Sequence, residues 1–132
     1  MRSQLSRLLS RSARPRVLPL DGPSLSVALT PQGSDVIVYF WGPGCVDCRA
    51  LAPSIERLAD EQPDITVVAL DVKRSSRSAA DYGVEQLPTV IRFRDAEPVA
   101  VAVGALPYDV LVDHLGLPRA SGRPRRPPGN TV

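Results

Sequence analysis

Cysteine and histidine are scarce in this chain of 132 residues, and their scarcity argues against two classes of protein. The two cysteines, Cys45 and Cys48, are too few for the disulfide framework of small secreted domains, which favours a reducing, cytoplasmic location. A structural zinc ion takes four ligands, and the chain offers these two thiols and one distant histidine, His114. The cysteines therefore call for another explanation, and half of a zinc site is only a minor alternative.

Long apolar runs are missing as well. No run of about 18 apolar residues exists, so the sequence predicts no transmembrane helix. Residues 1–16 are rich in serine and arginine and lack the apolar core of a secretory signal. No aromatic side chain lies among their arginines, so stacking on nucleic-acid bases has no support.

The charge that is present is unevenly distributed. Residues 21–118 hold all 14 acidic residues but only seven of the 16 basic ones, and both ends carry arginine without acid. We therefore expect a disordered basic arm over 1–16, one domain over 17–117 and a disordered Arg- and Pro-rich tail over 118–132. A misplaced start, a transit peptide or a surface-binding arm are alternatives for 1–16, but we expect neither end to bind nucleic acid or lipid.

The chain is organised around the stretch that carries both cysteines. The continuous apolar run 36–40 predicts a strand buried on both faces, and the residues 42–44 (Gly-Pro-Gly) break it. After Cys48 the apolar period changes to that of an amphipathic helix, with one stripe formed by Leu51, Ile55, Leu58 and Ala59. Cys45 is thus expected where the strand gives way to the helix, and Cys48 one helical turn further on.

This position suits thiol–disulfide exchange. The N-terminus of a helix has free N–H groups and a positive dipole end, which favour a thiolate, the form that attacks disulfides. Residues three apart share a helix face, so Cys48 can reach Cys45; we expect Cys45 to attack and Cys48 to resolve the mixed disulfide. A purely structural staple is the alternative, but in the chain-entropy model so short a loop stabilises by only about 2 kcal/mol.

The remaining patterns complete an α/β chain. We expect an edge strand over 17–20, a helix over 24–29, a second buried strand over 65–70 parallel to the first, a short helix capped by Ser75 or Ser76, a hairpin of strands over 90–94 and 99–103, and a last helix opened by Pro107 as a first-turn residue and ended by Gly116.

Taken together, these motifs resemble the thioredoxin family. The residues that carry the resemblance, which covers roughly 17–117, are Phe40-Trp41, Cys45-x-x-Cys48, Pro53, Tyr82-Gly83-Val84, Leu87-Pro88-Thr89 and Val103-Gly104-Ala105. The resemblance implies a three-layer α/β thioredoxin fold, in which a central mixed five-stranded sheet carries helices on both faces.

The resemblance also implies an activity and a set of site residues. The activity is that of a thiol–disulfide oxidoreductase that reduces protein disulfides, with an electron-donating reductase as second partner, no cofactor beyond the redox pair, and a monomeric state. Cys45 and Cys48 would be catalytic, Trp41, Asp47 and a cis Pro88 would support them, and Gly44, Leu87 and Gly104 would contact substrate. A binding or chaperone module with little turnover, or a disulfide-forming oxidant, are the alternatives.

The sequence departs from the family pattern at four places. Val46-Asp47 replaces the usual Gly-Pro between the cysteines, and the charge of Asp47 opposes ionisation of Cys45. Gly44 stands where the family has a substrate-contact tryptophan. Tyr39 replaces a buried acid and Ala69 the lysine usually paired with it, and the two losses agree because an unpaired buried charge is costly. We expect a specialised member of the family rather than a general reductant.

Overall fold

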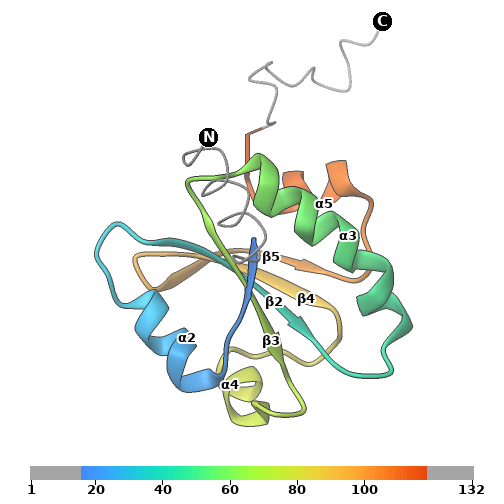
Figure 1. Ribbon diagram of the computed structural model, residues 1–132, viewed down its shortest axis with the longest axis horizontal. Coiled ribbons are helices and arrows are strands. Elements are labelled where there is room, and N and C mark those ends of the chain that lie inside the picture. Colours follow the sequence, from blue (N-terminus) through green and yellow to red (C-terminus); the bar gives the residue numbers. More distant parts are fainter. Residues whose placement is uncertain (1–15, 119–132) are drawn as a thin grey trace, which may run out of the picture.

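A five-stranded sheet runs through the centre of the computed structural model, which describes residues 16–118 (Figure 1). The strands are β1 (Val17–Pro19), β2 (Asp35–Trp41), β3 (Thr66–Asp71), β4 (Thr89–Arg94) and β5 (Glu97–Val103), in the spatial order β1-β3-β2-β4-β5. β1, β3 and β2 are mutually parallel, β4 is antiparallel to β2, and β5 is antiparallel to β4. The mixed five-stranded sheet expected from the sequence is confirmed. The boundaries proposed at residues 17 and 117 stay predictions, and the arm and tail lie outside the described residues except Arg16 and Pro118.

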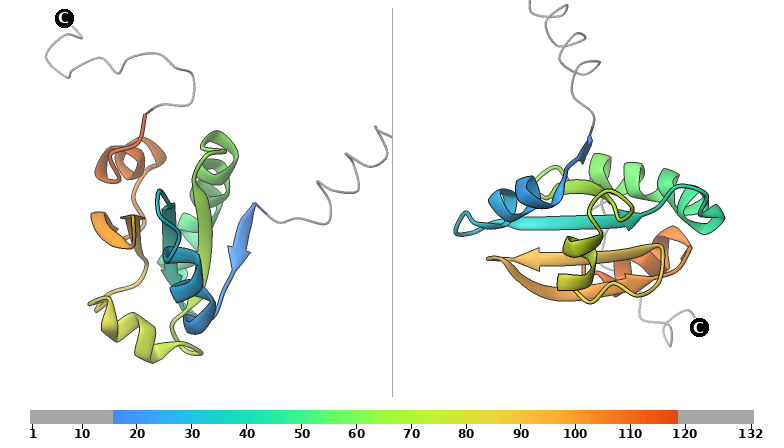
Figure 2. Two further views of the ribbon diagram at one scale, coloured as in Figure 1. Left: turned by 90° about the vertical axis from the view of Figure 1, so that its left-hand side faces the viewer. Right: turned by 90° about the horizontal axis from the view of Figure 1, so that it is seen from below.

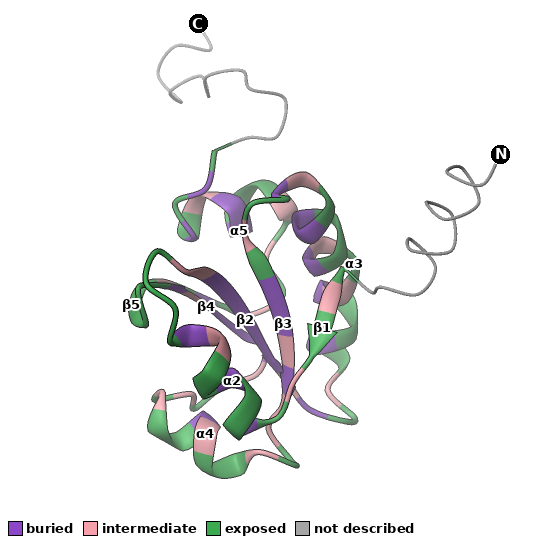
Figure 3. Ribbon diagram, turned by 60° about the vertical axis from the view of Figure 1, so that its left-hand side comes forward, coloured by how far each residue is buried: buried purple, intermediate pink, exposed green. Residues whose placement is uncertain are grey.

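Helices cover both faces of this sheet (Figures 1 and 2). α3 (Val46–Glu61) and α5 (Tyr108–His114) lie on one face, and α2 (Gly22–Leu29) and α4 (Ser76–Asp81) lie on the other. Each layer has its own hydrophobic cluster, and the central strands are buried by both (Figure 3). This is the three-layer α/β arrangement that the resemblance implied.

Strand β2 supplies side chains to both clusters because neighbouring residues of a strand point to opposite faces. Ile37 and Tyr39 pack with α3 and α5, whereas Val36, Val38 and Phe40 pack with α2 and α4. A strand that is buried on both sides cannot alternate between polar and apolar residues, which explains its continuous apolar run.

Helix α3 follows β2 and carries the predicted stripe on its inner face. Leu51, Ile55, Leu58 and Ala59 are all buried, and the helix continues through Pro53 to Glu61. Its far half is tied to α5: Arg57 and Tyr108 both bond to the Glu61 carboxylate, at 2.8 and 3.0 Å. Burial, followed by this bond to Glu61, raises the pKa of Tyr108 to about 12.

Two local predictions need correction. Ser75 is the N-cap of α4, but its side chain makes no capping hydrogen bond, so this short helix is held by packing of Ala79 rather than by its cap. Pro107 lies immediately before α5 as its N-cap, with extended backbone, instead of forming part of the first turn. Gly116 follows α5 with a positive φ of 65°, as the sequence predicted for its end.

Arg92 of β4 ties the end of α5 to the sheet. Its Nε and Nη2 donate to the two carboxylate oxygens of Asp35 at 3.0 and 2.8 Å, and its Nη1 donates to the carbonyl oxygens of Leu115 and Gly116 at 3.0 and 3.1 Å. The side chains of Arg92 and Asp35 are only 12% and 19% exposed. A planar guanidinium suits this task because it presents several donors in a fixed geometry.

Candidate active site

Three strand ends meet at the edge of the sheet where α3 begins. The register pairs Phe40 of β2 with Thr89 of β4, and Thr89 with Val103 of β5. The chain neighbours of these positions are Trp41, which follows Phe40, the Leu87-Pro88 pair, which precedes Thr89, and Gly104, which follows Val103. Segments that are up to about 60 residues apart in sequence are therefore brought to one place by strand pairing alone.

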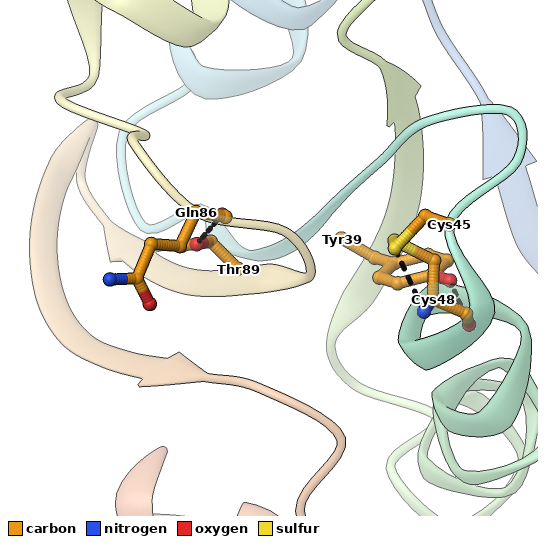
Figure 4. Close-up of a disulfide and its surroundings, with 5 residues drawn as sticks. All are labelled: Tyr39, Cys45, Cys48, Gln86 and Thr89. Atoms are coloured by element: carbon orange, nitrogen blue, oxygen red, sulfur yellow. Dashed lines mark hydrogen bonds between the residues drawn. A yellow bond between two sulfur atoms is a disulfide. The ribbon is translucent and has the colours of Figure 1, made fainter.

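The two cysteines occupy this edge and are joined by a disulfide, with their Cα atoms 5.2 Å apart (Figure 4). Cys45 is the N-cap of α3, and its Sγ accepts a hydrogen bond from the backbone N–H of Cys48 at 3.1 Å. In the reduced protein the same N–H group and the positive end of the helix dipole would favour negative charge on this sulfur.

Burial distinguishes the two sulfurs. Cys48 is 1% exposed, inside the cluster that packs α3 against the sheet, whereas Cys45 is partly exposed. A protein substrate can therefore reach Cys45 but not Cys48. On the surface around Cys45, Gly44 and Asp47 are exposed, and Trp41 is half-buried against the same core cluster.

Tyr39 lies beneath the cysteines and bonds directly to one of them. Its hydroxyl donates to the carbonyl oxygen of Cys48 at 2.5 Å, and the side chain is 7% exposed (Figure 4). Burial raises the pKa of Tyr39 above its ordinary value, so the group stays a neutral donor at physiological pH. The first turn of α3 is thus anchored to β2 by a neutral hydrogen bond. The donor is Tyr39, the residue that replaces the buried acid of the family pattern.

The loop 86–89 forms the other side of the site. The Leu87-Pro88 bond is cis, as expected, and the Thr89 hydroxyl closes the loop by donating to the carbonyl of Gln86 at 2.6 Å (Figure 4). The N–H of Gly104 donates to the Pro88 carbonyl at 2.9 Å. Loop 86–89 also approaches the turn before the cysteines, because a Cβ atom on Gly42 would lie 3.0 Å from Leu87 Cδ1. Leu87, Pro88 and Gly104 are therefore held together as one unit.

Two bonds at this site were not predicted from the sequence. One is the Tyr39–Cys48 bond; the available signal was a tyrosine within a buried aliphatic strand, because a buried tyrosine hydroxyl usually finds a partner. The other is the Thr89–Gln86 bond, whose signal was a threonine directly after Pro88.

Within residues 16–118 no three or more His, Cys, Asp or Glu side chains are grouped so as to hold a metal ion. None of the helices described there has the length and apolar character needed to cross a membrane.

A disulfide at the first turn of the helix that follows a central strand defines the class of thiol–disulfide exchange proteins. Comparison with known proteins identifies the family: a family model of thioredoxin matches residues 17–116, and the chain belongs to the thioredoxin family. The chain is 40% identical to thioredoxin of Chlamydia muridarum over 77 residues, which cover 58% of this chain and 76% of that protein. It is 32% identical to thioredoxin of Mycobacterium bovis over 98 residues, covering 74% and 84%.

Solved structures agree with this assignment. A mutant thioredoxin from Halobacterium salinarum NRC-1 superposes with a TM-score of 0.68 at 32% identity, over 76% of this chain and 89% of that one. The protein is accordingly a thiol–disulfide oxidoreductase, and members of its family act on disulfide-containing protein substrates.

Asp47→Asn should increase the fraction of Cys45 that is thiolate at neutral pH in the reduced protein. Asp47 is exposed in the first turn of α3, two residues from Cys45, and removing its negative charge relieves repulsion of the thiolate. Because exposed charges are screened, the fall in the titration midpoint should be small but measurable. Thiolate absorbance against pH measures it, with Asp64→Asn, in a distant loop, as control. An unchanged or raised midpoint would contradict the role given to Asp47.

Proposed function

We propose that the protein reduces disulfides of protein substrates, with Cys45 as the attacking and Cys48 as the resolving thiol. The observation that carries this assignment is the contrast between a partly exposed sulfur at the N-cap of α3 and a buried sulfur bonded to it. Only the Cys45 sulfur is accessible to a protein. The buried Cys48 sulfur is held close enough to form a bond with it.

The cycle is balanced within the cysteine pair. The Cys45 thiolate attacks one sulfur of the substrate disulfide, which forms a mixed disulfide and releases the other substrate sulfur as a thiolate that takes up a proton. The Cys48 thiolate then attacks the Cys45 sulfur, which releases the second substrate thiol and leaves Cys45–Cys48 oxidised. Two electrons have passed to the substrate, so a partner must return two electrons and two protons. An electron-donating reductase is the class that does this, and no further cofactor enters the cycle.

The neighbouring residues take supporting roles in this proposal. Trp41 packs under the pair, and Pro88, whose carbonyl oxygen accepts a hydrogen bond from Gly104, shapes the face presented to the substrate. Gly44 and Gly104 contact the substrate on this face. The backbone of Leu87 pairs with an extended segment of the substrate. We further propose that the protein works in the cytoplasm as a monomer, since its cysteine content suits a reducing compartment.

The test is the reduction of a disulfide-bonded reporter protein by dithiothreitol, with and without catalytic amounts of the protein. We expect a marked acceleration, and none after the two thiols have been alkylated. Equilibration with graded ratios of reduced and oxidised glutathione, followed by alkylation, gives the potential of the pair. A reductase requires a value below about −230 mV, whereas a value near about −120 mV would indicate an oxidant. Absence of acceleration by a pair that cycles normally would leave a binding module.

A further inference from the structure

An apolar groove lies beside Cys48, between α3 and the strands β1, β2 and β3. Its volume is about 550 Å³, and its walls carry Val17, Pro19, Tyr39, Trp41, Ile55 and Ala69. Two charged side chains, Arg49 and Glu56, also line it, but both are exposed and opposite in sign. We call this feature the Cys48 groove.

Ala69 explains why the groove is open. It pairs with Tyr39 across β2 and β3, yet it is only partly buried although β3 is an interior strand. The strand beside it, β1, is three residues long and ends with Pro19, which pairs with Ala69. A methyl group at this position leaves space that a longer side chain would fill, because protein interiors otherwise pack without such voids.

The groove is continuous with the surface that receives the substrate. Cys48 lies in its wall, and so do Gly42, Pro43 and Gly44, the three residues that directly precede Cys45 in the chain. A Cβ atom built on Gly44 would meet no other heavy atom within 4 Å, so the space around this residue is open. A protein that brings its disulfide to Cys45 therefore has an apolar hollow within reach.

We propose that the Cys48 groove binds an apolar side chain of the protein substrate, aliphatic or aromatic, close in sequence to the cysteine that Cys45 attacks. The inference rests on the proposed function and specifies its substrate class. An extended chain advances roughly 3.3 Å per residue, so a side chain one to three residues from that cysteine can enter. The volume falls within the range of ordinary ligand pockets, and the apolar walls disfavour a charged occupant, whose desolvation they could not offset.

The test compares two synthetic peptide disulfides that differ at one position beside the cysteine, which is phenylalanine in one and serine in the other. We expect the wild-type protein to reduce the Phe peptide with a kcat/KM about tenfold higher, a typical discrimination for an apolar pocket. Ala69→Leu should raise KM for the Phe peptide about tenfold and leave the Ser peptide within about twofold. Ala52→Leu, which fills the groove from α3, should act in the same way and decides the matter if Ala69→Leu does not fold. Ala80→Leu, exposed on α4, is the matched control.

Each other outcome overturns the proposal in a recognisable way. Equal kcat/KM for the two peptides, or a preference that survives both groove-filling variants, would remove the subsite while leaving the reductase activity intact. A preference that emerges only after Leu5, Leu8 and Leu9 are replaced by serine would assign the groove to the N-terminal arm. Failure of the wild-type protein to reduce either peptide while it still reduces the reporter protein would remove the subsite alone. Failure on the reporter protein as well would overturn the proposed function, and the subsite with it.

Discussion

Cys48→Ser is expected to leave the protein covalently attached to its substrates, and Cys45→Ser to reduce catalysis to the rate of dithiothreitol alone. The first variant keeps the accessible nucleophile and loses the thiol that releases it, so the mixed disulfide accumulates. The second loses the only sulfur that a protein can reach, because Cys48 is 1% exposed. Incubation with a disulfide-bonded reporter, followed by non-reducing electrophoresis and mass analysis, measures both effects.

The double variant Cys45→Ser/Cys48→Ser separates true adducts from non-specific association. It should form no adduct, and dithiothreitol should release the adducts of Cys48→Ser. Adducts that form on Cys48 in the Cys45→Ser variant as readily as on Cys45 would show that the buried sulfur is accessible in solution. That result would reverse the proposed order of attack.

The elements around the two sulfurs show which structural features can be predicted from the sequence. The change from the apolar run of β2 to the stripe of α3 is a local pattern, so both elements and the position of Cys45 between them could be predicted. The parallel β2–β3 pair followed from the connecting helix, since such a crossover joins parallel strands. The exact ends of β2 and α2 differ from the prediction by one or two residues, because flanking residues such as Asp35 and Gly22 carry no apolar signal.

Contacts between distant residues were beyond this kind of inference. Alternation along β4 placed Arg92 on a face of the sheet, but its partners Asp35 and Leu115 lie 57 and 23 residues away in the chain. The Cys48 groove is likewise a product of four elements, β1, β2, β3 and α3, and the sequence showed only that Ala69 is small. Side-chain size is local information, whereas the space that a small side chain leaves depends on the strand and helix packed around it.

Arg92→Ala should be the most destabilising substitution of a charged residue in the described part of the chain, at about 2 to 3 kcal/mol. It removes a nearly buried bidentate pair, leaves the Asp35 carboxylate without its principal partner, and frees the carbonyl groups at the end of α5. For a domain of about 100 residues this corresponds to a fall in Tm of roughly 10 to 20 °C. Urea and thermal unfolding of the oxidised proteins, compared with wild type, measure the loss.

The neighbouring Arg94 is a matched control that isolates geometry from charge. Its Nε lies 4.0 Å from the same Asp35 carboxylate, but its side chain is 63% exposed, so Arg94→Ala should cost less than about 0.5 kcal/mol. Arg92→Lys keeps the charge and loses the fork that serves the carboxylate and two carbonyl oxygens at once, so it should recover only part of the stability. Equal losses of stability for Arg92→Ala and Arg94→Ala would mean that positive charge near Asp35 matters and that the hydrogen bonds from Arg92 to the end of α5 do not. Because the hydrogen bonds of Arg92 join β4 to the end of α5 rather than to α3, none of these variants should change the reduction potential of the Cys45–Cys48 pair.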